Sequence, residues 1–597
     1  MSDYNAPLQD MKFVIEELAG LDRISALPGC EEVNSELVDA VLGEAAKFGS
    51  GVLAPLNRSG DRHGARFQDG AVTSADGFRE AYGQFVAAGW GSLSGQEQFG
   101  GQALPEIVSV PVSEIWNSAN MAFCLCPMLT SGAVEAISRH GSPELQQRYL
   151  PKLTSGQWTG TMDLTESQAG SDLSAVRTRA VPEGNRYRLY GTKIFITWGE
   201  HDLAENIIHL VLARTPNAPE GTKGISLFVV PKFLVNDDGS LAGRNDVQCV
   251  SIEHKLGIHA SPTAVIAYGD KDGAIGYLVG EENHGLEYMF TMMNLARLGV
   301  GAEGVAIGER AYQHALAYAK QRVQGRAIGV RNGGRVTIIH HPDVRRMLMS
   351  MKAQIEAMRA LTYFTAGALD IALRHPDPQK RAESQALFDL LTPVVKGWCT
   401  EQSIEIASLG VQIHGGMGYI EETGAAQYLR DARITSIYEG TTGIQALDLL
   451  GRKIAFDKGI TVGALFMEMQ KLASQPLDNH NADVVAILAL FRSALASLIK
   501  ATESLLPAFS SGLKGAAAGA VPYLKMFGFV AGGWQMTRAA LIADRKLAQG
   551  ADNRNFYNAK ITTARFYADY ILPTAYAHGH AVEHGMASVM GLSEAQF

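Results

Sequence analysis

The chain has 597 residues, which is too long for one hydrophobic core and, at roughly 150 residues per domain, predicts about four domains. It is 46% hydrophobic and 19% charged, which is typical of a globular protein with a sizeable core. Its formal net charge of −9 disfavours a protein whose main role is nucleic-acid binding, because phosphate contacts require clustered Lys and Arg.

The N-terminus and the cysteines point to a reducing compartment. The first twenty residues contain Asp and Glu where a signal peptide would have a basic region and an apolar region. The five cysteines are an odd number scattered over the chain, which argues against a disulfide framework. The longest uncharged run, residues 115–134, contains Pro127 and two Asn, and it predicts a buried helix–turn–helix rather than a membrane span. We expect a cytoplasmic protein without a transmembrane segment.

The apolar pattern along the chain changes period twice. Residues 1–160 have helical spacing, and Gly141, Ser142 and Pro143 mark a helix end followed by a new N-cap and first turn. Over residues 161–283 the period becomes two, in runs such as "RYRLYGTKIFITW" and "NIIHLVLAR", which predicts a β domain. Long helical patterns return over 284–457 and predict a helix bundle, and 458–597 is predicted to form an additional helical domain.

Two patterns that could suggest ligand sites are better explained by structure. "GVGAEG" (Gly299, Gly301, Gly304) matches a dinucleotide fingerprint, but no strand precedes it and no acidic residue lies about twenty positions later. We interpret these glycines as one face of a closely packed helix. The pair His340 and His341 precedes Pro342 and predicts a loop entering a helix. No metal site is predicted.

Four motifs in order carry a resemblance to a known family. A hydroxyl-rich loop containing "TESQAGSD" begins at Thr165, and "GTKIFITWG" follows some twenty-five residues later. Further on come "VQIHGGMGY" with "YLRDARI", and then "IYEGTTGIQ". Together they resemble the acyl-CoA dehydrogenase family over roughly residues 35–455. The section after about 460 resembles a large bacterial subfamily that includes 3-methylmercaptopropionyl-CoA dehydrogenases and long-chain fatty acyl-CoA dehydrogenases.

The resemblance implies an α+β multidomain fold: an N-terminal helical domain, a middle β domain and a C-terminal helix bundle, here with an additional helical domain. It also implies FAD as cofactor. Leu164 and Thr165 match flavin contacts, and Phe195 and Thr197 match the aromatic residue on the isoalloxazine and the hydroxyl beside it. Phe195 departs from the family's usual Trp: it keeps a stacking surface but lacks the indole donor.

Other residues match contacts to the distant parts of the cofactor and the substrate. Arg322, Gln412 and Gly416 correspond to residues that grip FAD from a neighbouring subunit, and the Arg fork suits a diphosphate. Thr441 corresponds to a further phosphate contact. The resemblance also implies substrate contacts by Ser171, Asn294, Arg297, Tyr438 and Gly440.

The catalytic base implied by the resemblance is Glu439. A carboxylate among apolar neighbours has its pKa raised and becomes a stronger base for a weakly acidic α-proton. Some relatives carry the base at the position of Ala296, and alanine cannot abstract a proton.

The resulting prediction is dehydrogenation of an acyl-CoA to trans-2-enoyl-CoA in fatty acid β-oxidation, by a homo-oligomer that passes electrons to electron-transfer flavoprotein. The alternative is 3-methylmercaptopropionyl-CoA dehydrogenation in sulfur-compound catabolism. More distant alternatives are an acyl-CoA oxidase and a non-catalytic DNA-binding flavoprotein, although Arg and Lys form no basic block.

Overall fold

The computed structural model describes residues 4–331, 333–476, 481–511 and 513–597, and these form two compact units. The helical unit contains the segments up to Glu44, Pro105–Ser118 and Val300–Phe597, and the β unit contains Ala45–Leu104 and Ala119–Gly299. Both units combine segments that are far apart in the sequence. The four-domain division stays a prediction, because compact units follow spatial contact and not domain boundaries.

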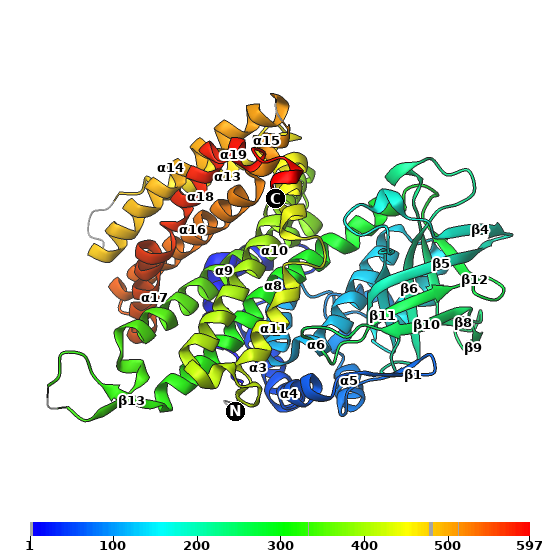
Figure 1. Ribbon diagram of the computed structural model, residues 1–597, viewed down its shortest axis with the longest axis horizontal. Coiled ribbons are helices and arrows are strands. Elements are labelled where there is room, and N and C mark those ends of the chain that lie inside the picture. Colours follow the sequence, from blue (N-terminus) through cyan, green and yellow to red (C-terminus); the bar gives the residue numbers. More distant parts are fainter. Residues whose placement is uncertain (1–3, 332, 477–480, 512) are drawn as a thin grey trace. The chain divides into compact units, whose positions relative to one another are not determined.

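The β unit is built on an eight-stranded sheet with the order β10-β11-β5-β12-β7-β6-β3, and β4 pairs with β5 (Figure 1). Neighbouring strands are antiparallel except β3 and β6, which are parallel. The predicted change to a period of two is thus confirmed as a β region. The strands are β3 Trp158–Asp163, β4 Arg179–Glu183, β5 Arg186–Thr197, β6 Asn206–Ala213, β7 Ser226–Pro231, β10 Val247–Ile252, β11 Thr263–Tyr268 and β12 Ala274–Val279, with the small pairs β1 Arg66–Gln68 with β2 Ala71–Thr73 and β8 Phe233–Val235 with β9 Leu241–Arg244.

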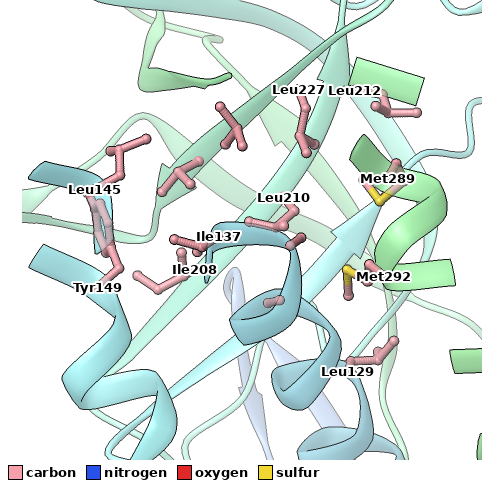
Figure 2. Close-up of a cluster of buried hydrophobic side chains, with 14 of the residues drawn as sticks. Leu129, Ile137, Leu145, Tyr149, Ile208, Leu210, Leu212, Leu227, Met289 and Met292 are labelled. Carbon is pink, nitrogen blue, oxygen red and sulfur yellow. The ribbon is translucent and has the colours of Figure 1, made fainter. Parts of the chain in front are cut away.

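Helices cover one face of this sheet. Every residue of β6 is buried, so its alternate side chains enter two different clusters. Figure 2 shows the cluster on the helix side, where side chains of β6 and β7 meet helices α6 (Glu106–His140), α7 (Pro143–Thr154) and the start of α8 (Gly285–Gln321). Its labelled members are Leu129, Ile137, Leu145, Tyr149, Ile208, Leu210, Leu212, Leu227, Met289 and Met292. The unit also contains α4 Ala54–His63 and α5 Phe78–Ala87.

Local signals explain where two of these helices begin. The Ser142 hydroxyl accepts a hydrogen bond from the Leu145 backbone N–H at 3.3 Å, so the predicted cap of α7 is confirmed. The uncharged run lies in α6, which consists of two helical segments joined at a kink. The predicted interruption is therefore present, as one non-helical residue in place of a turn. Only Asn120 leaves helical geometry (φ −160°, ψ 87°), and its Oδ1 accepts from the Phe123 N–H at 3.2 Å, which recaps the helix after a kink.

Within the part of the chain that the structure describes, two helices are long and apolar enough to cross a membrane by length and composition alone. They are α6 and the Ala482–Pro507 part of α14 (Ala482–Ser511). Within α6, 67% of the apolar window is buried inside the protein, as in the core helix of a globular protein.

The helical unit is centred on α8, α9 (Pro342–Arg374) and α10 (Pro378–His414), which lie side by side in Figure 1. Gly301 and Gly304 let α8 approach α10 closely: a Cβ on Gly301 would lie 2.3 Å from Val395, and one on Gly304 would lie 2.8 Å from the Cys399 backbone. The interpretation of "GVGAEG" as a packing face is confirmed. The predicted helix start at Pro342 is also confirmed.

The C-terminal helices, orange to red in Figure 1, belong to the same unit, and α16 packs against α9, α10 and α12. Trp398 of α10 is fully buried, and a Cβ on Gly528 would lie 2.1 Å from its ring. The other α-helices and strands described in this unit are α1 Leu8–Phe13, α2 Leu21–Ser25, α3 Ser35–Phe48, β13 Val323–Arg326, β14 Arg335–Thr337, α11 Ala425–Thr435, α12 Thr442–Leu447, α13 Ile460–Ala473, α15 Leu513–Ala518, α16 Ala520–Ala548, α17 Arg554–Phe566, α18 Thr574–His584 and α19 Met586–Val589.

A buried charge network joins elements from both ends of the chain within the helical unit. Arg359 of α9 pairs with Asp10 of α1, Glu114 of α6 and Glu309 of α8. Lys560 of α17 also pairs with Asp10. Because a buried charge that loses its partner is costly, this network fixes the N-terminal and C-terminal helices to the bundle.

Candidate active site

The predicted base lies in a tight loop between α11 and α12 of the helical unit. The N–H groups of Ile437 and Tyr438 both donate to the Ile434 carbonyl, at 2.8 and 3.1 Å, and end the helical turn. Glu439 then has φ +55°, a left-handed conformation that costs about 1–3 kcal/mol for a residue other than glycine. Gly440 follows with φ +88°. A strained carboxylate-bearing residue is thus held at the tip of the loop.

Side chains from two helices hold this strained loop in place. Gln445 of α12 donates from Nε2 to the carbonyls of Glu439 and Gly440, at 3.0 and 3.2 Å. Lys396 of α10, which is fully buried, donates from Nζ to the Gly440 carbonyl at 2.7 Å. The φ of +88° at Gly440 favours glycine, and a Cβ there would lie 2.8 Å from Gln445 Nε2, so it would displace the amide that bonds the loop.

A second carboxyl lies behind the predicted base. Tyr438 donates its hydroxyl hydrogen to Glu303 of α8, whose side chain is fully buried. Burial, together with the negative charge of Glu439, raises the pKa of Glu303 to about 8, against the opposing effects of the Tyr438 hydrogen bond and Lys396. Burial also raises the pKa of Tyr438 well above its ordinary value.

The predicted flavin loop lies in the β unit, directly after β3. Glu166 organises it, because this carboxylate accepts hydrogen bonds from Lys193, Thr178, the Arg177 backbone and Gln168. Burial alone would raise the pKa of Glu166, but the Lys193 ammonium and these hydrogen bonds lower it to about 2. Lys193 also donates to the Leu164 carbonyl at 2.9 Å.

The flavin loop and the end of β5 are joined, which brings the predicted flavin contacts together. The Ile194 N–H donates to the Thr165 carbonyl at 2.9 Å, one residue before Phe195. Phe195 has φ +60° and is 59% exposed, which is unusual for a large aromatic side chain. Thr197 is the last residue of β5 and is half-buried. An exposed ring beside backbone and hydroxyl groups suits a planar aromatic ligand.

The predicted substrate contacts in the β unit occupy two places. Ser171 is exposed on the hydroxyl-rich loop. Asn294 and Arg297 lie one turn apart on α8, with Arg297 Nη1 3.5 Å from Asn294 Oδ1. The Arg297 guanidinium lies 5.9 Å from the centre of the Phe290 ring and is buried.

The residues predicted to reach FAD in a neighbouring subunit lie at one end of the helical unit. Tyr318 of α8 stacks on His414 of α10, with ring centroids 4.4 Å apart. Arg322 follows Tyr318 by one turn, and Gln412 and Gly416 flank His414. All three are exposed, as an inter-subunit contact requires. Thr441 caps α12, and its hydroxyl accepts from the Ile444 N–H at 3.4 Å.

The residues that shape both loops were missed by the sequence analysis. Glu166 and Lys193 lie inside the quoted motifs, and Lys193 occupies an inward position of β5, where a charge breaks the alternating pattern. Glu303 lies in "GVGAEG", where a charge on a packing face was the available signal. Lys396 gave no comparable signal. Within the described residues, no group of three or more His, Cys, Asp or Glu could hold a metal ion.

Comparison with known families decides what these loops belong to. Residues 37–157, 161–270 and 283–454 match the N-terminal, middle and C-terminal domains of acyl-CoA dehydrogenase, and residues 465–593 match the family described as acetyl-CoA dehydrogenase C-terminal like. The chain belongs to the acyl-CoA dehydrogenase family. It is therefore an oxidoreductase that acts on the CH–CH bond of acyl-CoA thioesters. The family uses FAD, and the exposed Phe195 beside the Glu166-organised loop fits its isoalloxazine ring.

Two curated relatives and one solved structure extend along nearly the whole chain. The 3-methylmercaptopropionyl-CoA dehydrogenase of Ruegeria pomeroyi is 51% identical over 95% of this chain and 96% of its own length. A butyryl-CoA dehydrogenase of Syntrophomonas wolfei is 34% identical over 100% of this chain and 99% of its own. The structure of Caenorhabditis elegans ACDH-11 in complex with C11-CoA shares the fold, with a TM-score of 0.76 at 21% identity over 98% of this chain and 95% of its own.

Proposed function

We propose that this acyl-CoA dehydrogenase oxidises 3-methylmercaptopropionyl-CoA, with Glu439 as the catalytic base. The observation that carries the substrate is the 51% identity with the Ruegeria pomeroyi enzyme across both full lengths, against 34% for the butyryl-CoA dehydrogenase. This favours the sulfur-containing substrate over the fatty acyl-CoA predicted first from the sequence.

The chemistry assigns a defined task to each loop. Glu439 takes the α-proton of the thioester, and its backbone N–H polarises the thioester carbonyl as an oxyanion hole does. Bound FAD supplies the acceptor for the hydride that leaves the β-carbon. Thr165, Phe195 and Thr197 are the residues that would hold the flavin ring. The substrate loses two protons and two electrons in total and becomes the trans-2-enoyl thioester.

An acyl-CoA series tests the substrate. Pentanoyl-CoA is the matched control, because it has a methylene where 3-methylmercaptopropionyl-CoA has sulfur. We expect kcat/KM to fall by about tenfold or more for butyryl-CoA and octanoyl-CoA, since one methylene in an apolar pocket is worth that much. The kcat/KM for pentanoyl-CoA should lie within roughly tenfold of that for 3-methylmercaptopropionyl-CoA, because the two acyl chains have the same length and differ only at one atom. An optimum at butyryl-CoA or at a long chain would instead support fatty acid β-oxidation.

Replacing Glu439 tests the base. Glu439→Gln keeps the shape and the backbone N–H but removes proton transfer, which is worth about two to four orders of magnitude. In anaerobic mixing with the best acyl-CoA, the variant flavin should stay oxidised while the wild type bleaches. Bleaching within tenfold of the wild-type rate would show that Glu439 is not the base. Flavin content and product binding, measured on the same sample, serve as controls.

The electron acceptor is proposed to be an electron-transfer flavoprotein. Reduction of purified electron-transfer flavoprotein in the presence of substrate, compared with peroxide formation in air, tests this. Peroxide as the main product would make the protein an acyl-CoA oxidase.

The cytoplasmic location remains a prediction.

The proposed assembly is a homo-oligomer of at least two chains. The exposed positions of Arg322, Gln412 and Gly416 support it, because these residues match contacts to FAD in a neighbouring subunit. Light scattering of the flavin-saturated protein should give at least a dimer. A flavin-saturated monomer would contradict the proposal.

The C-terminal helices are proposed to support assembly and folding rather than chemistry. Truncation near residue 458 removes α16 and uncovers Trp398 of the bundle, so the shortened protein should lose solubility or association. A soluble truncated oligomer of unchanged subunit number would contradict this role.

A further inference from the structure

Glu303 has an environment that helix packing alone does not explain. It lies on α8 between Gly301 and Gly304, the two glycines that bring α8 against α10. Its side chain is fully buried, and Tyr438 donates to its Oε2. Among the described residues, its Oε1 has no hydrogen-bond partner. Burying a polar group with so few hydrogen bonds costs free energy, so an apolar side chain would stabilise this packing more than a carboxyl does.

The single hydrogen bond indicates the charge state of this carboxyl. An ionised carboxylate in the interior requires several donors or a directly bonded cation. The titratable groups that act on Glu303 are Tyr438, Glu439 and Lys396. The negative charge of Asp431 acts on Tyr438. Lys396 donates to the Gly440 carbonyl, and Glu439 adds a like charge. Burial and this like charge raise the pKa of Glu303 to about 8.

We propose that Glu303 is a positioning residue for the catalytic base. As an uncharged carboxylic acid, Glu303 holds Tyr438, and through it the adjoining Glu439, from the buried side. This inference rests on the proposed role of Glu439. The strained backbone of Glu439 needs support, and Glu303 supplies it to the preceding residue while Lys396 and Gln445 supply it to the following one. A neutral acid gives this support without placing a second negative charge beside the base.

Two variants of Glu303 separate positioning from charge. Glu303→Gln keeps an acceptor for Tyr438 and resembles the neutral acid, whereas Glu303→Leu removes the acceptor. The measurement is the anaerobic rate of flavin bleaching by 3-methylmercaptopropionyl-CoA at neutral pH. We expect Gln to stay within about threefold of the wild type and Leu to slow the reaction at least about tenfold with little change in KM, as misplacement of a reacting group does. If the Glu303→Leu variant reacts as fast as the wild type, Glu303 does not position the base. If the Glu303→Gln variant reacts as slowly as Glu303→Leu, Glu303 does not act as a neutral acid.

A double-mutant cycle keeps the proposal testable if Glu303→Leu folds poorly. Tyr438→Phe removes the donor of the same hydrogen bond. The partner variant is Glu303→Met, which removes the acceptor with an unbranched side chain. Because the two residues act through one contact, Glu303→Met should slow the wild type at least about tenfold but should make the Tyr438→Phe variant no slower than it already is. If the double variant is slowed by the product of the two single-variant effects on the bleaching rate, the two residues do not act through one contact, and the proposal is overturned.

The pH dependence provides a readout that a structural role alone would not change. In the wild type, the rate of flavin bleaching should show a second ionisation with its midpoint near pH 8, where Glu303 releases its proton next to the base. The Glu303→Gln variant should lack this step. Identical profiles in both proteins would overturn the neutral acid.

Failure of this inference can be distinguished from failure of the proposed base. If Glu439→Gln bleaches at a rate close to that of the wild type, the proposed function of Glu439 is wrong. If Glu439→Gln is inactive while every Glu303 variant behaves like the wild type, only the positioning role of Glu303 is wrong.

Discussion

The two loops, one in each unit, are both organised by a buried glutamate, but the pKa values of the two glutamates are shifted in opposite directions. Glu166 in the β unit accepts hydrogen bonds from backbone and side-chain donors and from the Lys193 ammonium, so its pKa lies near 2 despite its burial. Glu303 in the helical unit accepts one from Tyr438, and its pKa is raised to about 8. The number and charge of the donors, rather than burial itself, decide which carboxyl is ionised.

The largest expected effect comes from neutralising the well-bonded glutamate. Glu166→Gln leaves the fully buried Lys193 without its counter-charge, and we expect a loss of about 3–5 kcal/mol in the free energy of unfolding. Denaturant unfolding of the flavin-loaded protein measures it. The matched control is Glu183→Gln on the neighbouring strand, an exposed partner of Arg186 that should change stability by about 1 kcal/mol or less. Equal effects of the two variants would contradict the comparison.

A smaller effect is expected where the base loop depends on backbone conformation. Gly440→Ala forces alanine into a left-handed conformation and crowds Gln445, so we expect a loss of about 1–3 kcal/mol and slower flavin bleaching. Gly443→Ala in α12 is the control, because the nearest atom, Thr441 Oγ1, lies 3.8 Å from the added Cβ. If both alanines were tolerated equally, the loop would be less constrained than its geometry indicates.

The pH dependence of stability should have opposite signs for the two glutamates. The stabilisation from Glu166 is present above its ordinary pKa of 4.5 and is lost as the pH falls towards 2. Folded Glu303 keeps its proton up to about pH 8 while the unfolded chain releases it near 4.5, so stability falls as the pH rises through that window. Relative to Glu303→Gln, the wild type should lose up to about 1.4 kcal/mol per pH unit there. Urea unfolding of both proteins from pH 5 to 9 tests this, and parallel curves would contradict it.

The smallest expected effect concerns Thr441. Thr441→Ala removes the cap of α12 and should cost about 1 kcal/mol, whereas Thr441→Ser keeps the hydroxyl and should cost less. Flavin titration of the apoprotein adds a second readout. A weaker affinity for FAD in the Ala variant, but not in the Ser variant, would support the predicted phosphate contact, and unchanged affinity would leave Thr441 as a helix cap only.

Much of the fold and the outline of the site could be predicted from the sequence. Periods of two and 3.6 residues separated the β region from the helices, and Ser142 with Pro143 located a helix start. The motifs located Glu439 and the Phe195 region. An interruption of the uncharged helix was predicted from its Pro and Asn residues, but only the structure located it at Asn120, because one capping side chain can restart a helix without a separate turn.

The sequence by itself determined the class of fold, the order of the motifs and the family, because these depend on local periodicity and on residues that are close along the chain. The tertiary structure alone decided which charged side chains support the loops. Glu303 and Tyr438 are 135 positions apart, and Glu166 and Lys193 are 27 positions apart. Whether a carboxyl is buried, how many donors reach it and whether it is therefore ionised depend on the packing of distant segments, which no local pattern records.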